Sequence, residues 1–195
     1  MSYPFDLNRF FKAPIIKIDN RVRPPNLIQR EFDECQKEIN LIIDGLGNAS
    51  AKAQHLHAAV TSSSKLASSD HFMYLIKDPE GNGGYGLAIG FLKIGFKKLY
   101  VYDLKGEMHE REPLCVLDFY IRESYQRQGY GKRLYDYMLM HEKMEPPQLA
   151  IDRPSLKFSS FLKKHYGLSH SIPQTNNFVI FEGFFSNQSE GNCLF

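Results

Sequence analysis

The sequence contains no tryptophan, and its three cysteines form no Cys-x-x-Cys pair. An odd cysteine count without a secretion signal indicates a reducing compartment rather than a disulfide framework. No apolar run reaches the roughly 20 residues that a membrane-spanning helix needs. The N-terminus also lacks a basic flank followed by a long apolar core. We therefore expect no membrane insertion and no signal peptide.

Motifs of several ligand-binding classes are also absent. The seven histidines show no metal-ligand spacing such as HxxxH, so no metal is expected. No Gly-Lys-Ser/Thr follows the glycine-rich segment, which excludes a Walker P-loop. The net charge of +2 is too balanced to indicate nucleic-acid binding. We expect a monomer without a nucleic-acid partner.

The chain has the size and the composition of one folded domain. Its 195 residues are 43% hydrophobic, and they include 15 phenylalanines and 11 tyrosines. A domain of this length buries roughly 70% of its unfolded surface, so it folds without metal or disulfides. We expect one domain over residues 1–187, with an aromatic, strand-rich core, and a flexible C-terminal end over residues 188–195.

The N-terminal third reads as a short strand followed by helices. An apolar run within residues 14–18 predicts the strand. Apolar residues recur every three or four positions over residues 28–46, which predicts an amphipathic helix that ends near Gly45 and Gly47. A second helix is expected at residues 51–57, and a polar loop at residues 61–70.

The middle of the chain predicts two hairpins. The first joins strands at residues 71–76 and 85–93 through a turn at residues 78–84. The second begins with a strand at residues 97–103, turns, and returns in a strand that ends at Ile121. The tip of this second hairpin is charged, so we expect it to face solvent.

The last third alternates strands and helices. Strands are expected at residues 114–121, 148–151 and 178–181, and helices at residues 129–143 and 155–166. Strand–helix–strand in this spacing predicts a parallel pair with a right-handed crossover. Antiparallel hairpins followed by a βαβ unit predict an α/β (α+β) fold, a mixed twisted sheet with helices on both faces.

The most informative segment is residues 126–131, with sequence QRQGYG, between a strand and a helix. Glycines at 129 and 131 let the backbone approach a ligand and expose N–H groups, and the positive end of the helix dipole points to the same place. Arg127 adds a cation. A plain glycine-rich turn is the alternative, but the preceding strand and the Gln-Arg pair favour a pyrophosphate site.

This turn resembles the acetyl-CoA motif of the GNAT superfamily of N-acetyltransferases. The order of strands and helices expected for this chain also resembles theirs. The resemblance implies acetyl-CoA as co-substrate, with its pyrophosphate on the turn. Its pantetheine would lie along the edge between the strand before the helix and the strand after it.

One branch of that superfamily, the α-tubulin N-acetyltransferases, is similar over about residues 1–187. The resemblance is weak at residues 19–35 and 103–111. It rests on long ungapped words in the same order, which are residues 41–54, 60–61, 90–99, 112–120, 150–155 and 173–185. It implies an acetyltransferase domain that modifies a lysine of α-tubulin in the microtubule lumen, and hence a place in the cytoplasm on microtubules, in the cilium or axoneme.

Asp152 is the leading candidate for a proton acceptor. A lysine amine has a pKa of about 10.4, so it must lose a proton before it attacks a thioester. Asp152 follows a short buried strand, at the end of a parallel strand where α/β sites lie. Its alternative role is a helix cap paired with Arg153. The resemblance supports catalysis, because this Asp matches a residue that the branch uses.

Two further residues are assigned to catalysis by the resemblance. On the sequence alone Cys115 is a small buried thiol of the core. The family match places it in the active site as a proton relay or a wall of the acetyl pocket, and direct transfer is expected over an acyl-enzyme. Gln54 cannot titrate, but its amide can orient a lysine or a water.

The remaining candidate residues are binding residues. Those expected to contact acetyl-CoA are Phe119, Tyr120, Ile121, Gln126, Arg127, Gln128, Gly129, Tyr130, Gly131, Lys132, Ser155, Lys157 and Lys164. Those expected to contact the acidic tubulin substrate are Lys93, Lys97, Lys98, Tyr100, Arg153, Asn177 and Phe178. For the lysines the alternative is an ordinary solvated face. A microtubule-binding scaffold without turnover and an acetyltransferase for another protein remain alternative functions.

Overall fold

The computed structural model describes residues 5–21 and 28–186. The chain divides into two compact units. The first contains Met1–Gly95 and Leu117–Met138, and the second contains Phe96–Val116 and Leu139–Phe195. The predicted C-terminal end over residues 188–195 lies outside the described residues. No helix in the described part of the chain is both long and apolar enough to cross a membrane.

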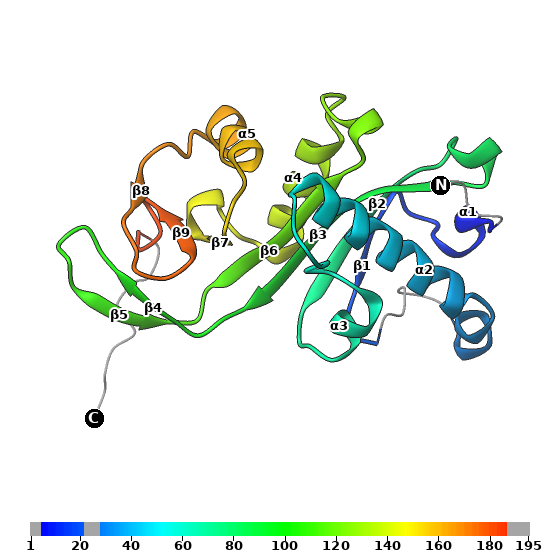
Figure 1. The fold of residues 1–195 in the computed structure, drawn as a ribbon, viewed down its shortest axis with the longest axis horizontal. Helices are drawn as coiled ribbons and strands as arrows, with labels where there is room; N and C mark the ends of the chain where they lie inside the picture. Colours follow the sequence, from blue (N-terminus) through cyan, green and yellow to red (C-terminus); the bar gives the residue numbers. More distant parts are fainter. Residues whose placement is uncertain (1–4, 22–27, 187–195) are drawn as a thin grey trace. The chain divides into compact units, whose positions relative to one another are not determined.

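The sheet is mixed, as the sequence predicts, with the strand order β1-β2-β3-β6-β7-β9-β8. In the first unit β1 (Ile15–Ile18) pairs antiparallel with β2 (Phe72–Asp78), which pairs antiparallel with β3 (Leu87–Phe96). The fourth member, β6 (Leu114–Ile121), runs through both units. Figure 1 shows the strands in sequence colours.

Helices cover both faces of the sheet in the first unit. The 25-residue α2 (Gln29–Ala53) packs its apolar face on one side, where Ile39 and Ile43 join Met73 and Leu75 in one core. Tyr74 alternates to the other side and meets Tyr137 of α4 (Tyr130–Glu142) edge to face. Strand β3 is therefore buried along nearly its whole length. The smaller elements are α1 (Leu7–Phe10), α3 (Ser63–Ala67), η1 (Asn82–Gly84) and η2 (Glu123–Tyr125).

The second unit holds the remaining strands and α5 (Leu156–Tyr166). In it β7 (Ala150–Asp152) pairs parallel with β6, and Cys115 lies opposite Ala150. Strand β9 (Phe178–Phe181) pairs antiparallel with β7 and with β8 (Ser171–Ile172). A separate two-stranded ribbon is formed by β4 (Leu99–Tyr102) and β5 (Met108–Arg111). The short η3 (Pro146–Gln148) precedes β7.

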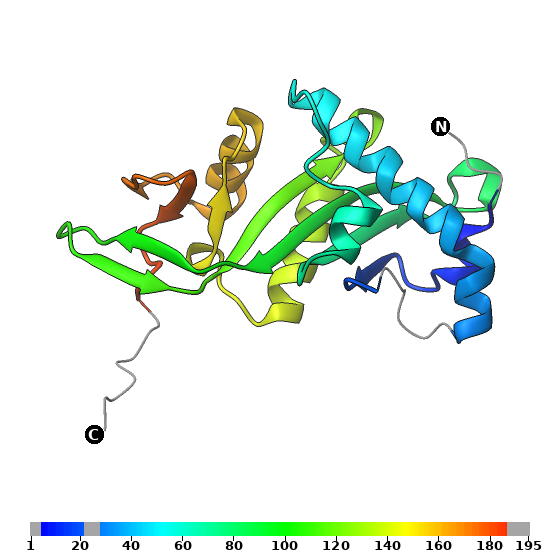
Figure 2. The same ribbon diagram turned by 60° about the horizontal axis from the view of Figure 1, so that its bottom comes forward.

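The prediction of two helices broken at Gly45 and Gly47 is wrong, because α2 continues through both glycines to Ala53. Its buried face continues past them with Ser50 and Ala51. A Cβ at position 47 would lie 1.9 Å from the Thr61 carbonyl oxygen. Gly47 therefore does not end the helix. Its missing side chain lets the backbone at Thr61 pack directly against α2. Figure 2 shows α3, which follows that segment, beside α2.

Two other predictions need correction. Residues 61–70 are not all loop, because Ser62 caps α3 through its side chain. The strand expected to run from the hairpin turn to Ile121 is two strands, β5 and β6, interrupted at Glu112 and Pro113. Proline has no N–H to donate to a ladder, so the break falls there. The parallel pair and the helix α5, capped by Ser155 and ended by Gly167, are confirmed.

Candidate active site

The glycine-rich turn leads from η2 into α4 within the first unit. Arg127 has φ 61° and Gly129 has φ 87°, so the turn contains two left-handed residues. Gly131 lies inside the first turn of α4, and only Gly129 of the two glycines has a positive φ. A Cβ at Gly129 would meet no atom within 4 Å, so the space beside it is open. The turn therefore fits an anionic ligand that approaches its backbone.

Backbone N–H groups at this turn are the donors that such a ligand needs. The Arg133 N–H donates to the Gly129 carbonyl oxygen at 3.0 Å, which starts the hydrogen bonds of α4. Amides of the first helical turn have no partner within the helix. Two glutamine side chains bond to the backbone that precedes the turn: Gln126 donates to the Ile121 carbonyl oxygen and Gln128 to that of Ser124, each at 2.8 Å. Their side chains thus shape the turn.

Cys115 lies on β6 and is fully buried. Its thiol is 3.4 Å from the Pro113 carbonyl oxygen, to which it donates. Burial raises its pKa to about 12, and the nearby Asp152 carboxylate adds to the rise, while Lys97 opposes it. The group is therefore a neutral thiol near neutral pH. It can pass on a proton or line a pocket, but it is a poor nucleophile.

Asp152 is the last residue of β7, beside β6 in the same unit. Its side chain is 31% exposed, and the Arg153 Nε atom lies 3.8 Å from its Oδ1. Arg153 has φ 41°, and its N–H donates to the Asn177 carbonyl oxygen at 3.0 Å. The chain turns sharply just after the carboxylate. Unusual backbone of this kind gathers at functional sites.

Gln54 follows the last residue of α2, where its amide joins a buried network that the sequence does not predict. Its Nε2 donates to Ser50 Oγ at 2.9 Å and to Asp118 Oδ1 at 3.3 Å. Thr61 Oγ1 donates to the other carboxylate oxygen at 2.6 Å. Signals for this network were present: Ser50 and Gln54 are four residues apart on a helix, and Asp118 interrupts an apolar strand.

The other residues expected at acetyl-CoA lie in both units. In the first unit Phe119 meets Tyr135 edge to face, Tyr120 is half-buried and Ile121 is buried. Tyr130 meets Tyr125 edge to face, and Lys132 pairs with Asp136 at 2.5 Å. In the second unit Ser155 Oγ accepts from the Phe158 N–H at 3.2 Å, which is the helix-capping role. Lys157 and Lys164 are exposed on α5.

The expected basic strip is only partly exposed. Lys93 is 5% exposed, and its ammonium donates to the Val60 carbonyl oxygen at 3.1 Å, so its place on a surface strip is wrong. Lys97 is half-buried, and Lys98 pairs with Glu110 at 2.7 Å. Tyr100 is exposed. Asn177 is exposed and Phe178 is half-buried. Phe178 pairs with Asp152 across β7 and β9, and Asn177 immediately precedes it.

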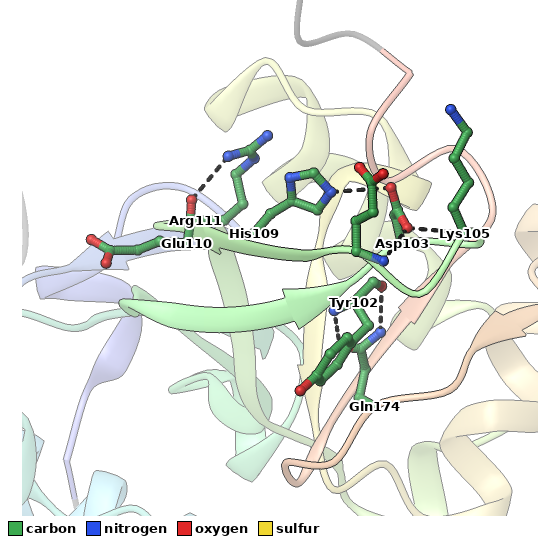
Figure 3. A network of polar contacts seen from close by, with 8 residues as sticks. Tyr102, Asp103, Lys105, His109, Glu110, Arg111 and Gln174 are labelled. Atoms are coloured by element: carbon green, nitrogen blue, oxygen red, sulfur yellow. Dashed lines mark hydrogen bonds and ion pairs between the residues drawn. The ribbon is translucent and has the colours of Figure 1, made fainter.

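The turn of the β4–β5 ribbon is held by side chains (Figure 3). Asp103 accepts from the N–H groups of Lys105 and Glu107, each at 2.9 Å, and contacts His109 Nε2 at 3.1 Å. These bonds lower the pKa of Asp103, with the His109 contact the main cause. Gln174 exchanges two 2.8 Å hydrogen bonds with the backbone of Tyr102. The Gln174 side-chain amide thus makes the two backbone hydrogen bonds at Tyr102 that a neighbouring strand would make.

A mixed sheet with a parallel β6–β7 pair, joined by a glycine turn and a helix, is the fold that the resemblance to the GNAT superfamily implies. Comparison with known families agrees: the family described as "GNAT acetyltransferase, Mec-17" matches residues 3–194. The chain belongs to this family.

Three of its relatives are named as alpha-tubulin N-acetyltransferases. It is 49% identical over 189 residues to "Alpha-tubulin N-acetyltransferase 1" of Danio rerio, which covers 97% of this chain and 63% of that protein. It is 48% identical to the "Alpha-tubulin N-acetyltransferase" of Trichoplax adhaerens, over 95% of this chain and 83% of the relative. The Anopheles gambiae protein of the same name is 44% identical, over 98% of this chain and 40% of that protein. The chain thus spans less than two thirds of the Danio rerio relative.

Proposed function

We propose that this protein is an acetyl-CoA-dependent lysine N-acetyltransferase that acts on α-tubulin in the microtubule lumen. The observation that carries the proposal is the identity of 44–49%, over nearly the whole chain, to proteins named for that activity. The site geometry is consistent with direct transfer in a ternary complex. We further propose a location in the cytoplasm on microtubules, in the cilium or axoneme, and a monomeric state.

The diphosphate of acetyl-CoA is the group that suits the turn before α4. Its oxygens would accept hydrogen bonds from backbone N–H groups of residues 128–131. Its negative charge would interact with the positive end of the helix dipole and with Arg127. Gly129 leaves the required space. Phe119, Tyr120 and Ile121 would border the pantetheine, and Ser155, Lys157 and Lys164 would contact phosphate or adenine.

Transfer requires that the lysine nitrogen attack the thioester carbonyl carbon while the carbon–sulfur bond breaks. Asp152 first accepts one proton of the ammonium, directly or through water. Coenzyme A leaves as the thiolate, and the second proton that the nitrogen loses as the amide forms neutralises that thiolate. Asp152 suits this role because its carboxylate is partly open at the end of β7. The neutral Cys115 thiol relays a proton or shapes the acetyl pocket. Its raised pKa argues against an acyl-enzyme.

The proposed substrate surface includes exposed and half-buried groups of the second unit. Lys97, Lys98 and Tyr100 precede and form β4, while Arg153, Asn177 and Phe178 lie near Asp152 in the β7–β9 pairing. Exposed cations would assist the encounter with acidic tubulin.

The test measures acetyl transfer to polymerised tubulin by the wild-type protein and by Asp152→Asn. We expect the substitution to lower kcat by about 100-fold or more, with acetyl-CoA affinity by calorimetry unchanged. Unchanged turnover would contradict the role of Asp152. Tubulin binding without any product from the wild type would favour the scaffold. A parallel Gly129→Val variant, which strains the turn, is expected to lose acetyl-CoA binding.

A further inference from the structure

The buried network around Asp118 lies entirely within the first unit. It joins three segments: the end of α2 through Ser50 and Gln54, the loop before α3 through Thr61, and strand β6 through Asp118 itself. Asp118 is 8% exposed, Ser50 1% and Thr61 0%. A carboxylate buried this deeply is costly unless its oxygens accept hydrogen bonds, and each of the two does.

The loop that carries Thr61 is itself fixed on α2. Asp44 accepts from the Ser63 N–H at 2.7 Å and from its hydroxyl at 3.1 Å. Gly47 allows the Thr61 carbonyl to rest on the helix, where any side chain would collide. Asp44, Gly47, Ser50 and Gln54 follow one face at the end of α2, spaced three or four residues apart. Thr61 is therefore held where its hydroxyl meets the carboxylate.

The network determines which way round the Gln54 amide lies. An ionised carboxylate only accepts, so the group of Gln54 that faces Asp118 must be its NH2. Ser50 donates its hydroxyl proton to Asp118 Oδ1 and thus has lone pairs for the second contact with Gln54. In the described part of the chain no group donates to Gln54 Oε1, and residue 54 is exposed. The amide thereby presents an acceptor to solvent.

We propose that Asp118 is a positioning residue that holds the Gln54 amide so that its Oε1 accepts from the amine of the substrate lysine. This proposal rests on the proposed function. A lysine ammonium is a donor without an acceptor, so only the Oε1 side of an amide can hold it. Once neutral, the amine keeps one N–H on Oε1, and its lone pair is directed away from Gln54. The opposite amide orientation would present N–H groups and repel the ammonium.

The test is a set of variants assayed on tubulin with acetyl-CoA. Asp118→Ala removes the carboxylate, and Asp118→Asn keeps an oxygen that can accept. Thr61→Val removes the hydroxyl, and Thr61→Ser keeps it. We expect the first member of each pair to lower kcat about tenfold without weakening acetyl-CoA binding. The conservative member is expected to restore kcat to within about threefold of wild type.

A double-mutant cycle separates positioning from a general structural effect. If Asp118 acts through Gln54, the double variant that carries both Gln54→Ala and Asp118→Ala has a kcat no lower than that of Gln54→Ala alone. Independent effects would multiply, to about 100-fold where each is tenfold, and that result would overturn the proposal. Weakened acetyl-CoA binding in both Asp118→Ala and Thr61→Val would overturn it too, because it would show a general loss of structure.

A measurement without turnover keeps this proposal distinct from the proposed function. In the 15N-labelled protein, the side-chain amide resonance of Gln54 is assigned by its loss in Gln54→Ala. We expect it to move toward the value of a solvated glutamine in Asp118→Ala and in Thr61→Val. An unmoved resonance would overturn the positioning role. A moved resonance, in a protein that never acetylates tubulin, would support the contact and refute only the proposed activity.

Discussion

At the scale of single residues, burial decides what chemistry each group can do. Cys115 and Asp152 come from paired strands, yet one is sealed in the core and the other is partly open. Desolvation makes the thiolate unfavourable, so the thiol stays protonated near neutral pH. The Asp152 carboxylate keeps contact with solvent. This difference supports the proposed role of Asp152, rather than Cys115, in proton acceptance.

Alkylation of Cys115 tests this division. Since burial raises its pKa to about 12, we expect iodoacetamide to modify it at pH 8 more than about 100-fold slower than free cysteine, with the rate rising as pH increases. Peptide mapping by mass spectrometry follows the reaction. Fast modification at pH 7, or an acetyl group found on Cys115 after mixing with acetyl-CoA, would indicate a thiolate nucleophile and contradict direct transfer.

At the scale of elements, α2 shows why glycine is an ambiguous signal. In sequence, Gly45 and Gly47 predict the end of a helix, whereas in the structure they lie in its interior. The reason for a glycine at position 47 is its contact with Thr61, fourteen residues further along the chain. No local sequence pattern contains this contact. The helix persists because its apolar face continues to be buried beyond the glycines.

A pair of substitutions tests this account. Gly47→Ala places a Cβ against the Thr61 carbonyl, so we expect a loss of about 1–3 kcal/mol in the free energy of unfolding. Gly45→Ala lies two residues away on another face, and better helix propensity is expected to gain about 0.5–1 kcal/mol. Urea unfolding measures both. A stability gain in Gly47→Ala would contradict the close packing of the loop on α2.

The β4–β5 ribbon offers a test of the substrate surface. Glu110 accepts from Lys98 and Tyr100, which lowers the pKa of Glu110 and raises that of Lys98. Glu110→Gln should leave Lys98 charged but unpaired, so we expect kcat/KM for tubulin to rise about two- to fivefold at low salt. The gain should disappear at high salt. A fall in kcat/KM at low salt would show that this ribbon does not meet an acidic surface.

Local patterns predicted much of the fold but only part of the site. The strand predicted at residues 114–121 matches β6, and Ser155 and Gly167 bounded α5, because these signals are local to each element. The network of Asp118 with Ser50 and Thr61 joins residues 57 and 68 positions apart, and it depends on the fold to bring them together. The burial of Lys93 depends in the same way on a carbonyl 33 residues away.

At the scale of the whole molecule, buried thiols link stability to pH. The pKa of Cys115 is raised from 9.0 in the unfolded chain to about 12 in the folded protein. The folded state keeps a proton that the unfolded state loses, so stability falls as pH rises. We expect the contribution of Cys115 to the urea midpoint to be constant below pH about 8.5 and to fall progressively between pH about 9 and 12. Cys115→Ala should reduce this slope, and an unchanged slope would contradict the assignment.

The central claim is that this chain moves an acetyl group from coenzyme A directly to a lysine of α-tubulin. The most direct measurement incubates the protein with isotope-labelled acetyl-CoA and polymerised tubulin, then locates the label by peptide mass spectrometry. The account predicts label on the ε-nitrogen of an α-tubulin lysine, and none on Cys115 of the enzyme when tubulin is left out. Unlabelled tubulin, or label retained on the enzyme, would contradict it.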